Sequence, residues 1–251
     1  MNSSLVFFKQ IKLVILLALT FSFCLATQAA ENKIKLNYPP TAKLFYFIRA
    51  DIKGLNIEGA GLIDWDKAGD KYHINSETRT ALTGVLVAEK SEGLIDNTGL
   101  APEIFSIKRF RKELITTRLD RKNHQINYQG NANPQSLLGA EQDRLSVLWQ
   151  LLSLARSTPN KFSAGSKHKF TVIGTQDSEP WIFEVKKPQR IQTGLGEVDA
   201  LQITRLPSEN PDAQGMEIWL APSLDWYPVQ IRLSEKNGDY IEQSLEKIEK
   251  K

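Results

Sequence analysis

Apolar and polar residues alternate along most of this chain, and turn residues interrupt the alternation about every 8 to 12 positions. A period of two places successive side chains on opposite faces of a β-strand. The first such segment has one apolar face: Leu44, Tyr46, Ile48, Ala50 and Ile52. The next two segments have similar faces that begin at Ile57 and Tyr72. Short alternating strands joined by turns are typical of an antiparallel sandwich or barrel.

The same pattern continues to the C-terminus. Further strands are expected in four stretches: residues 85–95, 103–110, 113–120 and 124–129. Two links, residues 66–70 and 236–239, have the composition of hairpin turns. So many strands cannot stay flat, because strand twist either curls a large sheet or splits it into two layers. The prediction is a mainly β protein with a large curved antiparallel sheet or open β-barrel.

One segment, Glu141 to Arg156, has a helical period instead. Its apolar residues recur at spacings of three and four: Leu145, Leu148, Trp149, Leu152 and Ala155. Asp143 near the start and Arg156 near the end carry the charges that a helix dipole favours, and Pro159 follows the segment. A single helix between two sets of strands is expected to pack on the sheet or inside it.

Residues 1–30 have the layout of a secretory signal peptide. Two lysines precede an uncharged apolar stretch over residues 13–26, and Ala29 and Ala30 provide a small-residue cleavage site. The apolar stretch is shorter than the roughly 20 residues of a membrane-spanning helix, which favours cleavage over an uncleaved anchor. We therefore expect a periplasmic protein without a transmembrane segment after cleavage, with residues 31–251 forming a single domain.

Cys24, the only cysteine, lies within this leader. The mature chain is then without disulfides, thiolate nucleophiles and cysteine metal ligands. Phe23 stands where a lipoprotein signal has a small residue, which disfavours lipid attachment at Cys24. Without the two leader lysines, the 32 basic residues become 30 against 29 acidic ones, a net charge of +1. This balance gives no reason to expect a nucleic-acid partner.

Familiar catalytic motifs are absent from the sequence. It contains neither a nucleophile elbow nor a glycine-rich phosphate loop, and the three histidines lack the spacing of metal ligands. Residues 64–70 resemble the start of a calcium loop, but Ala68 stands where an oxygen ligand is required. No metal or cofactor is predicted, and an enzyme is the least favoured class.

The densest positive cluster runs from Lys108 to Lys112, with Phe110 at its centre. Interleaved aromatic and basic residues can stack on nucleic-acid bases or contact anionic head groups. Glu113 follows directly, and basic residues at a sheet edge also prevent unwanted strand pairing. A solvated edge or turn is therefore the favoured interpretation.

Large aromatic residues are the candidate binding residues. Four lie on the apolar side of their segments and are the predicted ligand-binding residues: Trp65, Trp149, Trp181 and Phe183. Such residues either fill a core or line a cavity for an apolar ligand. Trp219 is out of phase with its apolar neighbours, so we expect it on the outer face, where it and Trp226 would form a partner surface.

Several segments resemble an uncharacterised bacterial envelope family, the domain of unknown function catalogued as 3108. They are Glu58 to Trp65 (EGAGLIDW), Ser91 to Glu103 (SEGLIDNTGLAPE), Gln142 to Leu151 (QDRLSVLWQL), Glu217 to Leu233 (EIWLAPSLDWYPVQIRL) and Glu235 to Asp239 (EKNGD). The resemblance implies an exported protein of Gram-negative bacteria without an established activity. It also implies a strongly curved sheet, broadly similar to the open half-barrels of periplasmic lipoprotein carriers, and it carries over no catalytic residue.

These features predict a periplasmic, non-enzymatic protein that binds or escorts an apolar ligand, such as a lipid, or an envelope polypeptide on a concave, aromatic-lined face. The alternative is a structural or assembly factor of the cell envelope that acts through protein–protein contacts. A hydrolase-type enzyme with an unrecognised site comes third. An unfilled cavity would favour the first class, exposed aromatics on a packed core the second, and convergent carboxylates or histidines in a cleft the third.

Overall fold

The computed structural model describes residues 35–208 and 214–251, so the predicted signal peptide and Cys24 lie outside the described residues. Residues 35–251 form one compact unit that is dominated by β-strands. In chain order the strands are β1 (Ala42–Ile52), β2 (Leu55–Ala68), β3 (Lys71–Thr80), β4 (Gly84–Asp96), β5 (Gly99–Arg109), β6 (Ile115–Asp120), β7 (Gln125–Tyr128), β8 (Gln135–Ser136), β9 (Gln142–Asp143), β10 (Lys167–Ile173), β11 (Ser178–Thr193), β12 (Gly196–Arg205), β13 (Gly215–Leu220), β14 (Pro228–Ser234) and β15 (Tyr240–Lys250). The helices are α2 (Ser146–Ser157) and the short η1 (Pro159–Lys161) and η2 (Pro222–Leu224).

All fifteen strands belong to one sheet, in the order β8-β7-β6-β5-β4-β3-β2-β1-β15-β14-β13-β12-β11-β10-β9. Neighbours in the sheet are also neighbours in the chain, except at its centre, where β1 pairs with β15. The pairing is antiparallel everywhere except between the short β9 and β10. The two edge strands of the described sheet are β8 and β9, and they do not pair with each other. The curved sheet is therefore an open barrel, as the sequence predicts.

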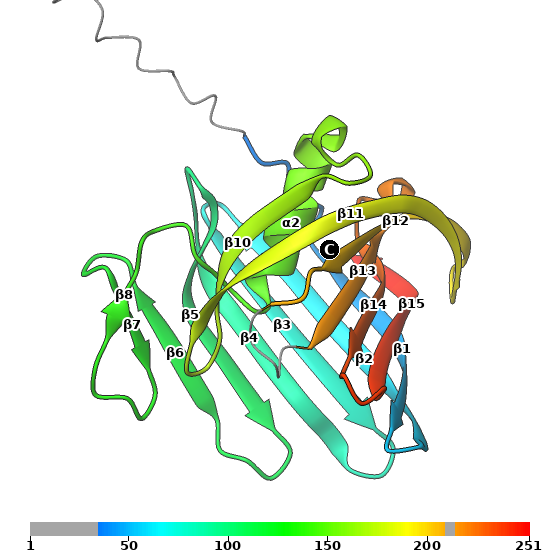
Figure 1. The fold of residues 1–251 in the computed structure, drawn as a ribbon, viewed down its shortest axis with the longest axis horizontal. Coiled ribbons are helices and arrows are strands. Elements are labelled where there is room, and N and C mark those ends of the chain that lie inside the picture. The colour runs from blue at the N-terminus through cyan, green and yellow to red at the C-terminus, as the bar shows by residue number, and fades with distance from the viewer. Residues whose placement is uncertain (1–34, 209–213) are drawn as a thin grey trace, which may run out of the picture. The chain divides into compact units, whose positions relative to one another are not determined.

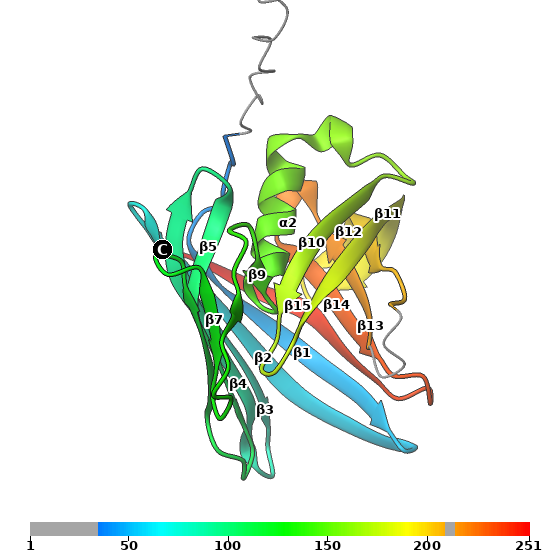
Figure 2. The same ribbon diagram turned by 60° about the vertical axis from the view of Figure 1, so that its left-hand side comes forward.

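The two arms of the sheet curl towards each other around α2 (Figures 1 and 2). Side chains bridge the arms where no strand ladder does. Thr117 Oγ1 on β6 donates to the carbonyl of Gly174, next to β10, at 3.0 Å. Ile173 of β10 packs in a small apolar cluster with residues from the other arm: Leu119, Ile126, Tyr128 and Leu137. These contacts link the two arms of the sheet, although the described edge strands β8 and β9 are not paired.

The predicted strands and turns are confirmed in position. The four stretches expected between residues 85 and 129 correspond to β4, β5, β6 and β7. Residues 66–70 form the β2–β3 hairpin, with Ala68 opposite Lys71. Residues 236–239 form the β14–β15 hairpin, where Gly238 adopts a φ of +95° that favours glycine.

The predicted helix exists, but it begins at Ser146 rather than at Glu141. The preceding residues pair with β10 as β9, and the carboxylate of Asp143 accepts the backbone N–H groups of Leu145 and Ser146. This carboxylate satisfies donors that a helix start leaves free.

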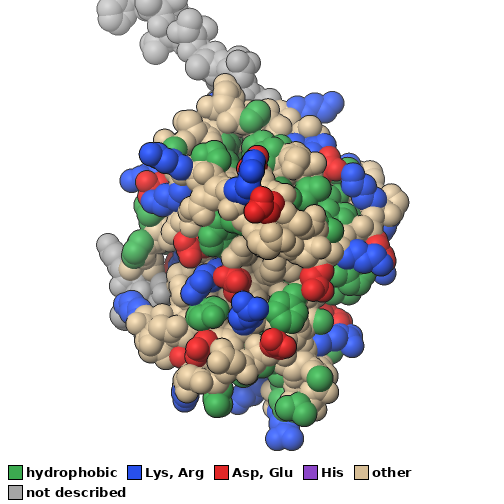
Figure 3. All heavy atoms as spheres, turned by 90° about the vertical axis from the view of Figure 1, so that its right-hand side faces the viewer, with side chains coloured by type: hydrophobic (Ala, Val, Ile, Leu, Met, Phe, Trp, Pro, Cys, Tyr) green, Lys and Arg blue, Asp and Glu red, His purple; other side chains and the backbone are tan. Residues whose placement is uncertain are grey.

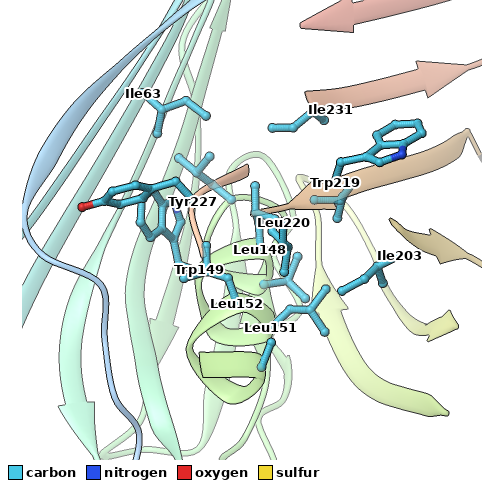
Figure 4. Packing of buried hydrophobic residues seen from close by; sticks show 14 of the residues in the cluster. Ile63, Leu148, Trp149, Leu151, Leu152, Ile203, Trp219, Leu220, Tyr227 and Ile231 are labelled. Atoms are coloured by element: carbon cyan, nitrogen blue, oxygen red, sulfur yellow. The ribbon is translucent and has the colours of Figure 1, made fainter. Parts of the chain in front are cut away.

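The predicted stripe of α2 is buried: Leu145, Leu148, Trp149 and Leu152. The opposite face is buried too, with Val147, Leu151 and Ser153. A helix enclosed on all sides lies inside the barrel rather than on its surface. Figure 4 shows Leu148, Leu151 and Leu152 projecting from α2 among side chains of the strands.

Gln150 anchors the helix to one hairpin. Its side chain accepts from the backbone N–H of Leu100 and donates to the carbonyl of Thr98, both at 2.9 Å. Gly99, between them, has a φ of +118°, and a Cβ there would lie 2.3 Å from Gln150. Only glycine allows the β4–β5 turn to approach the helix this closely.

The inner face of the sheet changes character along its length. Beside α2 its residues are apolar and fully buried, as Trp65, Ile74 and Phe105 illustrate. Further along the same faces, towards the β3–β4 and β5–β6 turns, stand Ser76 and Glu89. The helix therefore fills one half of the barrel and leaves the other half to line a cavity.

Candidate ligand cavity

A cavity of about 520 Å³ occupies the half of the barrel that α2 does not fill. Strands β3, β4 and β5 form one wall, and β11 to β15 form the other. Arg144, two residues before α2, borders the cavity where the helix begins. Small-molecule sites in proteins commonly have volumes of about 300–1,000 Å³. The cavity therefore has the size of a ligand site.

The wall from β3 to β5 carries polar groups, including Ser76, Thr78, Glu89 and Arg109. Register places Glu89 opposite Ser76 and Ile107, and therefore on the inner face. Burial raises the pKa of the Glu89 carboxyl above its usual range, and the charge of Asp143 raises it further, while Arg109 and Arg144 lower it. Within the described residues, the side chains of Glu89 and Arg109 have no hydrogen-bond or ion-pair partner. Their polar atoms remain available to a ligand.

The opposite wall combines apolar and polar side chains. Its apolar lining residues come one from each of four strands: Trp181, Met216, Leu233 and Ile241. The charged groups on this wall are paired, since Arg205 Nη2 lies 2.9 Å from Glu179 Oε1. Trp181 Nε1 donates to the same oxygen at 2.9 Å, and the Arg205 guanidinium carbon lies 4.0 Å from the Trp181 ring centroid. Burial lowers the pKa of Arg205, and Glu179 opposes that shift.

All four predicted ligand-binding residues belong to the buried core, and Trp181 is the one of the four that also borders the cavity. The rings of Trp65 and Trp149 stack with centroids 4.6 Å apart. Phe183 is fully buried and makes edge contacts with Phe170 and Trp181. These three residues fill the barrel around α2, the other outcome that the sequence left open.

The prediction that Trp219 lies exposed on the outer face is wrong, because its side chain is only 7% exposed. In the ladders Trp219 lies opposite Gln202 and Gln230, and its indole N–H donates to Gln189 Oε1 at 3.4 Å. Figure 4 shows Trp219 within the cluster of buried side chains. Trp226 is half-buried against the same core. The structure thus does not present these two residues as an exposed aromatic surface.

A buried polar network lies between the core and the cavity, and the sequence did not predict it. Ser91 Oγ on β4 donates to Asp143 Oδ2 at 2.5 Å, and Tyr72 Oη lies 3.0 Å from Ser91 Oγ. Burial raises the pKa of Asp143 to about 6, although hydrogen bonds from Ser91, Ser146 and Leu145 oppose the shift. The network fastens β9 at one edge of the sheet to β4 on the opposite arm.

Metal-ligating residues do not converge in the described part of the chain. Residues 35–208 and 214–251 contain no group of three or more His, Cys, Asp or Glu side chains that could hold a metal ion. His73 pairs with Glu92 at 3.3 Å, and His168 stacks on Phe162 with ring centroids 3.9 Å apart. Each of these histidines has a structural neighbour rather than a second metal ligand.

An open, strongly curved antiparallel sheet that encloses one helix and a cavity of mixed polarity defines a β-barrel-like class of protein. Residues 45–246 match the family described as "Protein of unknown function (DUF3108)", and the chain belongs to this family. The resemblance seen in the sequence segments is thereby confirmed. Comparison with curated proteins finds no match.

Comparison with solved structures finds similar chains from bacteria. One is a β-barrel-like protein of the domain of unknown function DUF1849 from Brucella abortus, with 13% identity and a TM-score of 0.55 over 86% of this chain and 99% of that chain. At this identity the similarity shows a shared fold alone. An outer membrane lipoprotein-sorting protein domain, so described, from Vibrio parahaemolyticus has 8% identity and a TM-score of 0.34, covering 84% and 86% of the two chains. A protein described as a lipoprotein, from Parabacteroides distasonis, has 10% identity and a TM-score of 0.37, covering 85% and 98%.

Within residues 35–208 and 214–251, no helix combines the length and the apolar character needed to cross a membrane.

Proposed function

We propose that this protein is an exported, non-enzymatic binding protein that holds an anionic amphiphile in its cavity. Such a ligand joins an apolar chain or ring system to a carboxylate, phosphate or sulfate group. The observation that carries the proposal is an unfilled cavity whose lining combines apolar side chains with polar side chains, of which Glu89 and Arg109 have no partner among the described residues. The periplasm is the compartment that the leader sequence favours for this role.

The volume of the cavity favours a small molecule over an envelope polypeptide. A cavity of about 520 Å³ is within the range of single small-molecule sites. The apolar part of the ligand would lie against Trp181, Met216 and Leu233. Burying such a part releases water from both surfaces, which contributes about 25 cal/mol for each Å² of apolar surface.

The charged side chains around Glu89 favour an anionic head group. Arg109 and Arg144 border the cavity beside Glu89, and burial favours the neutral form of Glu89. A guanidinium can bind a carboxylate or phosphate through two parallel hydrogen bonds. The negative groups on the other wall are less available, since Glu179 is paired with Arg205 and Glu235 accepts from Gln214.

Binding of anilinonaphthalene sulfonate, a fluorescent anionic amphiphile, tests this function. We expect saturable binding to the native protein, with a change in tryptophan emission. Trp181→Ala should weaken binding by about 1–3 kcal/mol, the value of burying one large apolar side chain. The far-UV circular dichroism of the variant should equal that of the parent protein.

A matched pair of charge variants provides the control. Arg109 lines the cavity, whereas Lys108 points to the outer face of the same strand. Arg109→Gln should weaken probe binding about tenfold, the effect of removing a charged hydrogen bond of about 1.5 kcal/mol, and Lys108→Gln should not. Equal effects of the two variants would contradict the proposal. So would binding that appears only in partly denaturing conditions, because loosened cores also bind such dyes.

A further inference from the structure

We infer that the protein docks on anionic membrane surfaces through the tips of three hairpins at one end of the barrel. The tips are the β1–β2 turn (residues 53 and 54) with the first residue of β2, Leu55, the β3–β4 turn (residues 81–83) and the β5–β6 turn (residues 110–114). This inference concerns the outside of the molecule and is independent of the cavity's ligand.

The three hairpin tips present exposed apolar side chains. Each exposes at least one large apolar side chain, with these exposed fractions: Leu55 67%, Leu82 97%, Phe110 40% and Leu114 48%. A folded protein gains nothing within itself from such exposure, whereas burial of each side chain in an apolar medium is favourable. Exposed apolar groups gathered in one region mark an interaction site.

The tips lie at the same end of the sheet (Figures 1 and 2). Strands β1 to β6 are consecutive neighbours in the sheet, so each hairpin lies about 10 Å from the next across the strands. The backbone N–H of Phe110 donates to the carbonyl of Leu86 at 2.7 Å, which ties the β5 tip to the start of β4. One flat surface can therefore contact all three tips.

The charge around the hairpin tips indicates which kind of surface they contact. Residues 108–114 carry four basic side chains and one acidic side chain, all exposed, and the other two tips are close to neutral. Over the face shown in Figure 3, by contrast, acidic and basic side chains are interspersed. Arg111 lies over the Phe110 ring, with its guanidinium carbon 4.9 Å from the centroid. Apolar side chains surrounded by positive charge match an interface of apolar chains beneath anionic head groups.

The membrane would lie at the end of the barrel where the cavity is found. The cavity walls include Thr78, Val87 and Arg109, which stand close to the β3–β4 and β5–β6 turns. Helix α2 occupies the other half of the barrel. A molecule in the cavity would consequently be close to the docked membrane surface.

Co-sedimentation of the protein, without its leader, with lipid vesicles tests the inference. We expect binding to vesicles that contain phosphatidylglycerol, weakening as salt concentration rises, and much weaker binding to phosphatidylcholine vesicles. Leu82→Ser should reduce the partition coefficient about tenfold or more, as expected for one buried leucine. Arg111→Gln and Lys112→Gln should each reduce it roughly fivefold, since a basic residue near an anionic surface contributes about 1 kcal/mol.

Leu138 provides the matched control, because it is 86% exposed but belongs to the segment between β8 and β9. Leu138→Ser should leave vesicle binding unchanged. The inference is overturned if the parent protein ignores both kinds of vesicle or if Leu138→Ser weakens binding as much as Leu82→Ser does. It is also overturned if Leu82→Ser abolishes a dimer in solution while vesicles are not bound, because the tips would then contact a second copy of the chain.

Discussion

Replacing Trp149 by alanine should lower the free energy of unfolding by about 3–5 kcal/mol, the usual cost of truncating a buried aromatic side chain. Trp149 is completely buried at the centre of α2 and stacks on Trp65 at 4.6 Å. It also makes an edge contact with Tyr227, with ring centroids 6.4 Å apart. Because the helix is enclosed by both arms of the sheet, the vacated space cannot collapse without moving strands. Urea unfolding followed by circular dichroism measures the loss.

Trp149→Phe is the matched control for this prediction. The indole N–H of Trp149 is buried without a hydrogen-bond partner among the described residues. Phenylalanine keeps an aromatic ring against Trp65 and removes that unpaired donor, so we expect a loss of no more than about 2 kcal/mol. If Trp149→Ala costs less than about 1 kcal/mol in a cooperatively folded protein, the helix is not the centre of the core.

The second large effect is a decrease in stability as the pH rises through the titration of Asp143. The pKa of Asp143 has the ordinary value of 3.8 in the unfolded chain and rises to about 6 in the folded protein, mainly because the carboxyl is buried. Below pH 3.8 the carboxyl is protonated in both states. Between that pH and about 6, the unfolded chain ionises while the folded protein retains the proton, so folding loses free energy. Two pKa units correspond to about 3 kcal/mol, lost by about pH 7.

Asp143→Asn isolates this contribution from that of Glu89, whose raised pKa acts in the same direction. The amide oxygen can still accept from Leu145 and Ser146, and the amide N–H group can donate to Ser91. We expect the variant to be more stable than the parent at about pH 7.5 and to lose most of the pH dependence between about pH 4 and pH 7. Urea unfolding at several pH values measures both effects.

Two results would contradict the Asp143 prediction. One is a parent protein that is at least as stable at about pH 7.5 as at about pH 5. The other is an Asp143→Asn variant that is less stable than the parent at neutral pH. Either result would mean that the carboxylate of Asp143 stabilises the fold in its ionised form, through the backbone N–H groups at the start of α2.

The alternation in the sequence predicted the strands well because the information is local. Whether Leu44 or Phe45 faces inwards depends on a period of two and on the turns that bound the strand. The helix was predicted for the same reason, and only its start was wrong. The pairing of Gln142 and Asp143 with β10 depends on residues about 30 positions away, which a helical period does not reveal.

The cavity was only partly predictable. Trp181 was identified from its phase, but the polar residues on the same inner faces were not identified as a site. Glu89 and Ser91 occupy inner positions of β4, and polar residues on an otherwise apolar face were the available signal. Whether such a residue faces a ligand site or a buried partner depends on what lies across the barrel. For Ser91 that partner is Asp143, 52 residues away.

The sequence by itself determined the strands, their inner and outer faces, most turns and a single apolar helix, since each depends on neighbours along the chain. The tertiary structure decided where the helix lies along the barrel and hence which inner residues are core and which line the cavity. It also decided that Trp219 is buried and that three hairpin tips share one end. These properties depend on sheet curvature and on the pairing of β1 with β15, which brings together the two ends of the described chain. Contacts between such distant residues arise only when the sheet closes around the helix.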